Sequence, residues 1–211
     1  MPDPCTLCET RKPRRWCPGV RQQICTQCCG SEREVTVDCP FDCEFLIDAR
    51  RHERTPAIER NQVPNLDVKI TEGFLHRTSN ILTMTSAALL DAAMNTPGAS
   101  DGDIREALQS LIKTYRTLQS GLIYESRPTN PFADSIQRHV QAAVQQIKEQ
   151  VFQTTGVHSV RDSDVLGVLV YLQRIEYANN NGRRRGRAFL HLLWNQLQQA
   201  RSVHGPAVPT P

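Results

Sequence analysis

All eight cysteines of this 211-residue chain lie within its first 43 positions. They follow the pattern Cys5-x2-Cys8-x8-Cys17-x7-Cys25-x2-Cys28-Cys29-x9-Cys39-x3-Cys43. A segment this short buries too little apolar surface to be stable through a hydrophobic core alone. Eight thiols are enough for two four-thiolate metal sites, so we expect bound metal to hold this segment together.

The spacing of the cysteines favours structural zinc. Such a site takes four soft ligands in a closed tetrahedron, and each C-x2-C turn supplies two of them. We expect one site from Cys5, Cys8, Cys25 and Cys28, and a second from the remaining four: Cys17, Cys29, Cys39 and Cys43. Two alternatives stay open, an exchange of Cys28 with Cys29 and the replacement of one thiol by His52.

Other uses of clustered cysteines fit less well. An iron–sulfur redox protein is the main alternative, but neither the bacterial nor the plant ferredoxin spacing is present. A redox C-x2-C pair would need a βαβ unit, and a closed all-sulfur site leaves no open position for catalytic zinc. We expect a cytoplasmic protein, because no signal segment precedes Cys5 and reduced thiols bind metal more often than they form disulfides.

The charge does not indicate a nucleic-acid-binding protein. The formal net charge of +3 treats the thiols as neutral. Eight thiolates and two zinc ions would lower it to about −1. In residues 1–60 ten basic residues balance ten acidic ones, so the metal-loaded segment would be acidic. A case for nucleic acid must therefore depend on local patches.

Composition and periodicity divide the chain into a small metal-stabilised, zinc finger-like module and an all-α helical bundle. We expect the two-zinc module at 1–54, a linker at 55–65, a five-helix domain at 66–201 and a disordered tail at 202–211. The module should contain a hairpin around residues 18–23, a strand at 34–38 and a helix at 44–54. The expected helices of the second domain cover about 71–95, 101–122, 131–151, 162–179 and 184–201.

Three stretches of the module resemble the opening of a group of uncharacterised bacterial proteins. They are Cys17-Pro18, the Ile24-Cys25-Thr26-Gln27-Cys28-Cys29-Gly30 run, and Cys39-Pro40-Phe41-Asp42-Cys43. That resemblance implies a zinc-binding module followed by a helical domain, and it brings no activity with it. The spacing is also loosely similar to the B-box, HIT and MYND cross-brace fingers, most of which bind proteins. Cys17 stands alone and Cys28-Cys29 are adjacent, unlike in those fingers, so the ligand pairing is not fixed by the resemblance.

Two arginine-rich patches are candidates for binding. The first is a possible anion site at the start of the last helix, where backbone N–H groups are free, and it comprises Arg183, Arg184, Arg185 and Arg187. The alternative is that these side chains are solvated or neutralise a neighbouring helix end. The second patch, residues 11–16, combines four basic residues with Trp16 and would suit nucleic acid, or it is a solvated loop in which Trp16 covers the metal site.

The favoured function is a non-catalytic interaction or regulatory protein. No Ser/His/Asp set, phosphate-binding glycine loop or H-E-x-x-H motif occurs. We expect the module to present a surface including Phe41, Phe45 and Leu46 to a protein partner. Nucleic-acid binding through the two arginine patches is the alternative, and an enzyme site in the helical domain ranks last.

Overall fold

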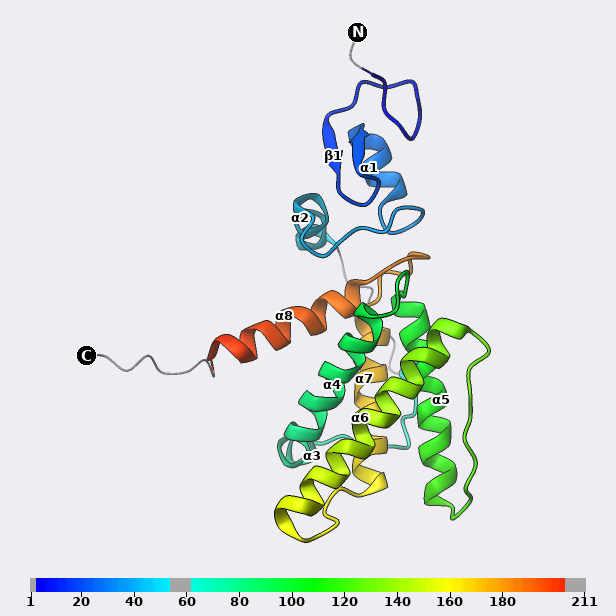
Figure 1. Ribbon diagram of the computed structural model, residues 1–211, viewed down its shortest axis with the longest axis vertical. Helices are drawn as coiled ribbons and strands as arrows, with labels where there is room; N and C mark the ends of the chain where they lie inside the picture. The colour runs from blue at the N-terminus through cyan, green and yellow to red at the C-terminus, as the bar shows by residue number, and fades with distance from the viewer. Residues whose placement is uncertain (1–2, 54–61, 204–211) are drawn as a thin grey trace, which may run out of the picture.

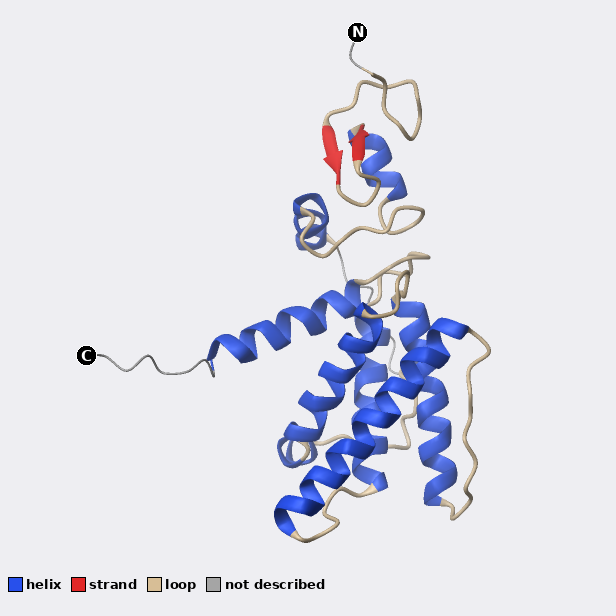
Figure 2. Cartoon of the chain, in the orientation of Figure 1, coloured by secondary structure: helices blue, strands red, loops and turns tan. Residues whose placement is uncertain are grey.

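The computed structural model describes residues 3–53 and 62–203. Its N-terminal part holds the cysteines, two short strands and two helices, and its larger part is entirely helical (Figures 1 and 2). The chain is thus mostly helical with a small cysteine-rich module. Among the described helices, none is long and apolar enough to cross a membrane.

The module is built on the expected hairpin. Strands β1 (Arg15–Cys17) and β2 (Gln22–Ile24) pair antiparallel, with Trp16 opposite Gln23. Helix α1 (Thr26–Glu32) follows directly, and helix α2 (Glu44–His52) occupies the position predicted for a helix. Among residues 3–53 the buried hydrophobic residues are Ile24, Val37, Leu46 and five of the cysteines. So few buried aliphatic side chains make a small core, which agrees with the expectation that metal stabilises this segment.

The strand predicted at 34–38 is wrong. Glu34 has a positive φ of 52°, and the backbone N–H groups of Val35, Thr36 and Val37 all converge on the carbonyl of Glu32. The segment is therefore a tight turn with one isolated bridge between Arg33 and Val37. Alternating apolar residues predict a strand only if a partner strand is available, and the two strands of the hairpin pair with each other.

Six helices form the second part of the chain. They are α3 (Glu72–Arg77), α4 (Ser79–Met94), α5 (Asp101–Gln119), α6 (Pro131–Thr155), α7 (Asp162–Asn179) and α8 (Ala188–Val203). Helices α4 to α7 pack side by side around one core, and α8 crosses the end of this bundle and projects beyond it (Figure 1). The apolar residues of α5 from Ile104 to Tyr115 are buried in this core and Leu118 packs against it, whereas Leu122 is exposed beyond the end of the helix.

Several helix ends agree with the sequence. The Ser100–Asp103 capping box begins α5, and the Asn130 side chain accepts the Phe132 N–H at the start of α6. Helix α7 begins at Asp162, as its predicted range requires, and Arg161 is its N-cap.

Two helix boundaries differ from the prediction. The single helix expected at 71–95 is interrupted at Thr78, which takes φ −100° and ψ 10° and donates its hydroxyl to the Phe74 carbonyl. Helix α8 begins at Ala188 rather than at 184, because the arginine segment before it is held by other contacts described below.

The predicted linker falls largely on residues 54–61, outside the described part. The predicted tail begins within α8, which continues to Val203, and the rest of it is not described.

Candidate metal centres

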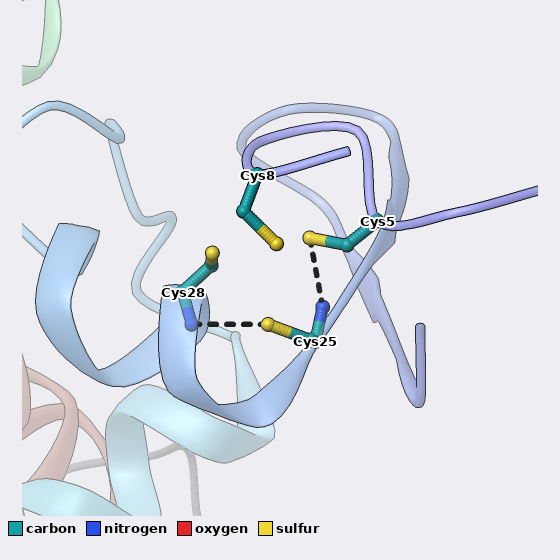
Figure 3. Close-up of side chains that lie close together, drawn as sticks. All are labelled: Cys5, Cys8, Cys25 and Cys28. Carbon is teal, nitrogen blue, oxygen red and sulfur yellow. Dashed lines mark hydrogen bonds between the residues drawn. The ribbon is translucent and has the colours of Figure 1, made fainter. Parts of the chain in front are cut away.

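Four cysteines converge on one point of the module. Cys5 and Cys8 lie in the loop before β1, whereas Cys25 and Cys28 lie at the start of α1, and all four sulfurs point toward one another (Figure 3). Each of their Sγ atoms lies within 4.8 Å of the other three. Tetrahedral zinc with bonds of about 2.3 Å requires sulfurs about 3.8 Å apart, so these thiols fit the ion. The structure thus brings together the four residues that the two C-x2-C motifs had grouped.

Backbone hydrogen bonds fix the positions of these sulfurs. The Cys25 N–H donates to Cys5 Sγ at 3.1 Å, and the Cys28 N–H donates to Cys25 Sγ at 3.4 Å. The second bond also makes Cys25 the N-cap of α1. N–H donors stabilise negative charge on sulfur, so the local fold favours the thiolate form that a metal needs.

The protonation of the four thiols is uneven. Hydrogen bonds from the Thr10 hydroxyl, and then from the backbone of Thr10 and Arg11, lower the pKa of Cys8 to about 5. The Cys28 N–H lowers the pKa of Cys25, whereas burial raises the pKa of Cys28 to about 12. A metal ion must therefore displace a proton from at least one buried thiol. Its binding will accordingly depend on pH.

The other four cysteines gather less tightly. Cys17, Cys29, Cys39 and Cys43 all line one small cavity of about 20 Å³ behind Trp16. Within residues 3–53 and 62–203, however, they do not form a second group at metal-ligand distance. Burial, followed by the negative charges of Glu34 and the neighbouring thiols, raises the pKa of Cys39 to about 11.

All eight cysteines are free thiols. His52, the alternative ligand, is the last residue of α2, is exposed, and belongs to no ligand group in the described part of the chain. The alternative in which His52 replaces a thiol ligand has no support at the site of Cys5, Cys8, Cys25 and Cys28, because four sulfurs already supply a tetrahedral set of ligands there.

Arginines lie against the sulfurs of both sets. The guanidinium groups of Arg15 and Arg33 donate to Cys29 Sγ at 3.5 and 3.7 Å. A hydrogen bond with Cys25 raises the pKa of Arg11. A four-thiolate zinc site carries a charge of about −2, and these cations offset it. The sequence prediction treated Arg11 and Arg15 as part of either a solvated loop or a nucleic-acid surface, and it did not include their contacts with the cysteines.

The arginine segment at 183–187 contacts the module. Arg183 Nη1 donates to the Arg33 carbonyl at 2.6 Å, and Arg185 Nη1 contacts Asp38 Oδ2 at 2.6 Å. Arg187 Nε donates to the Ala99 carbonyl at 2.8 Å, whereas Arg184 is exposed. Figure 1 shows this orange segment rising from the bundle toward the module.

Glu34 is the centre of this contact, and no sequence pattern predicted its role. Its carboxylate is fully buried and accepts hydrogen bonds from Arg50 Nη2 at 2.6 Å, Asn181 Nδ2 at 2.8 Å and the Arg187 N–H at 3.0 Å. Its carbonyl accepts the Arg185 N–H at 2.9 Å. One residue of the module thus binds both α2 and the segment before α8.

The N-terminus of α8 already has an anion. Asp101, at the start of α5, accepts the N–H groups of Phe189 and Leu190 at 2.9 and 3.2 Å. Burial raises the pKa of Asp101 to about 7. The free N–H groups expected at this helix start are thus bonded to a carboxylate from the same chain.

Two of the three residues predicted to form the partner surface, Phe41 and Leu46, are not free in the structure. Leu46 is completely buried, and Phe41 packs against His191 and Trp194 of α8, with ring centroids 5.7 and 6.3 Å apart. The Phe45 ring is covered by the Arg15 guanidinium at 4.2 Å. The exposed aromatic residue of the module is instead Trp16, at 56% exposure.

Comparison of the chain with models of protein families, with curated proteins and with solved structures found no match.

Proposed function

We propose that this chain is a zinc-stabilised, non-catalytic interaction protein. The carrying observation is the set of four sulfurs within 4.8 Å of one another, contributed by Cys5, Cys8, Cys25 and Cys28. All four positions of a tetrahedral ion are filled by protein, so the metal would have no open position for substrate or water. The role left to it is to hold the module in shape.

A second zinc ion belongs to the same proposal. The remaining four thiols share one cavity, and Arg15 and Arg33 supply positive charge beside Cys29. Ion binding would draw these sulfurs together, since folding and metal binding are coupled in small metal modules. Iron in place of zinc, with inorganic sulfide, is the competing occupant.

Metal analysis of protein purified without added metal tests this reading. We expect two zinc ions per chain and no acid-labile sulfide. Cys8→Ser and Cys43→Ser should each lose one ion and retain the other, which assigns one site to each set. Iron with stoichiometric sulfide would contradict the zinc assignment, and a single zinc lost in Cys8→Ser but kept in Cys43→Ser would remove the second site.

The surface beside Trp16 is the best candidate for the partner. A groove of about 500 Å³ lies there, lined by Trp16, Pro18 and Phe45 between the basic Arg14 and Arg15 and the acidic Asp42 and Glu44. Trp and Arg are the residue types enriched at the centres of protein interfaces, and polar residues form the rim around them. An extended segment of a protein partner, with an apolar side chain against Trp16, fits this groove.

Site-specific crosslinking tests the groove. A photoreactive benzoylphenylalanine at position 16 should capture a defined protein in cells, and Trp16→Ala should abolish co-purification of that protein. The matched control is Ile123, which is 96% exposed on the loop between α5 and α6. Capture of the same proteins from positions 16 and 123, or of none, would contradict the assignment.

Nucleic acid is the second candidate for the same surface. Arg11, Lys12 and Arg14 are exposed near Trp16, as phosphate contacts and base stacking require. Against it, Arg11 is engaged with Cys25, and in the patch at 183–187 both Arg183 and Arg185 contact the module. Binding of labelled single-stranded RNA and DNA distinguishes a nucleic-acid surface from a protein-binding surface. If nucleic acid binds here, its affinity must fall steeply between low and moderate salt, and it must also fall in Lys12→Ala or Arg14→Ala.

A further inference from the structure

A cleft of about 360 Å³ opens where the module meets the helical domain. Its walls come from the end of α2, the end of α7 with the segment that follows it, and the first turns of α8. In Figure 1 these three segments meet between the module and the bundle. The volume falls in the range of sites for small molecules.

Arg50 of α2 forms one wall of the cleft with unused hydrogen-bonding capacity. Its side chain is only 10% exposed, and Nη2 is bound to Glu34 at 2.6 Å. The other two guanidinium nitrogens, Nε and Nη1, are buried without a hydrogen-bond partner. Buried donors without acceptors are costly and rare in folded proteins, so a shift of this guanidinium toward an acceptor in the cleft would be favourable.

The other walls are polar as well. Arg183 also lines the cleft, and its guanidinium donates from Nη1 to the Arg33 carbonyl. Burial, and then the positive charge of Arg50, lowers the pKa of His191, so its ring is neutral at pH 7. The Asn195 amide bonds the Nδ1 side of that ring at 3.2 Å, which leaves Nε2 for a ligand.

We propose that this cleft binds a small organic anion through Arg50 and Arg183, with His191 and Asn195 contacting the body of the ligand. Guanidinium groups match the oxygens of a phosphate or a carboxylate, and these two anionic groups share the same chemistry here. Glu53 also lines the cleft, which favours a ligand that carries a hydroxyl or amino group in addition to its anionic end.

The site differs from the anion site predicted at residues 183–187. Arg185 and Arg187 are bonded to Asp38 and to the Ala99 carbonyl, and the helix start is bonded to Asp101. Only Arg183 of that segment lines the cleft, and its main cationic partner is Arg50, more than 130 positions earlier in the chain.

Inorganic phosphate and acetate are the probes for this site on the full-length, metal-loaded protein. The side-chain Nε–H resonance of Arg50, followed by NMR during titration, should shift and saturate with at least one of the two anions. Whichever anion binds more tightly identifies the phosphate or the carboxylate class. Arg50→Met should abolish the saturable response of the cleft residues.

A blocking variant keeps the test valid if Arg50→Met weakens the fold. Ala188 lines the cleft, and Ala188→Leu would fill it without removing a hydrogen bond. It should weaken anion binding at least tenfold, whereas Ala142→Leu, at an exposed site on α6, should not change it. Failure of both anions to shift the Arg50 resonance, or equal binding by the Ala188→Leu protein, would overturn the proposal.

Discussion

Replacing Glu34 by alanine should destabilise the whole chain. The substitution removes the acceptor for Arg50 Nη2, Asn181 Nδ2 and the Arg187 N–H, and it leaves the Arg50 guanidinium without an anion at 10% exposure. Breaking a buried ion pair by removing one partner costs about 3–5 kcal/mol. For a chain of this size that corresponds to a fall in Tm of about 6–20 °C.

The assay is urea denaturation followed by circular dichroism, with zinc kept saturating. Glu34→Gln should lose less stability than Glu34→Ala, because the amide oxygen still accepts one hydrogen bond. Alanine suits the comparison better than glycine. The φ of 52° at this position is favourable for glycine, so a glycine variant would gain backbone stability that has nothing to do with the lost carboxylate. Glu149→Ala, at an exposed position on α6, is the matched control. A loss below about 1 kcal/mol in Glu34→Ala would refute the role assigned to this carboxylate.

Three further predictions follow from features described above or from the packing of α7. Chelation of zinc should melt the module but leave most helical ellipticity, and Cys25→Ser should make the chain sensitive to milder chelators; unchanged proteolysis of the module after chelation would contradict this. Burial raises the pKa of Asp101 above its unfolded value of about 3.9, so the contribution of this residue to stability falls as pH rises from about 4 to about 7. Asp101→Asn should therefore flatten the pH dependence of Tm over that range, as measured by thermal melting. Gly167→Ala would place a Cβ 2.4 Å from Phe74 Cζ and should cost about 1–3 kcal/mol in urea titrations, whereas Gly73→Ala, with open space around it, should be neutral or stabilising.

Local patterns predicted the helical part of the chain well. Apolar residues at steps of three and four, with caps such as Ser100 and Asn130, placed α5 and α6 close to their observed starts. The C-x2-C motifs likewise identified the four thiols that converge, because two short turns leave each pair of sulfurs little freedom. Both kinds of signal lie within a few residues of the feature that they predict.

The contacts between the two parts of the chain could not be predicted in this way. Asn181 and Arg187 are 147 and 153 positions from Glu34, and a hydrogen bond across that separation leaves no periodic mark in the sequence. The same limit explains why the start of α8 was misplaced, since its cap comes from Asp101 in another helix. The break at Thr78 was missed for a different reason, because threonine is compatible with a helix interior.

The separation between Glu34 and Arg187 also has a consequence for synthesis. A ribosome adds about 5–20 residues per second. The 153 positions between the two residues therefore take about 8–30 s to appear, during which the N-terminal module is complete but has nothing to dock against. Throughout that interval Phe41 lacks its contacts with α8 and Glu34 has only Arg50 as a partner, so the module must hold its shape on its own contacts until α8 is made.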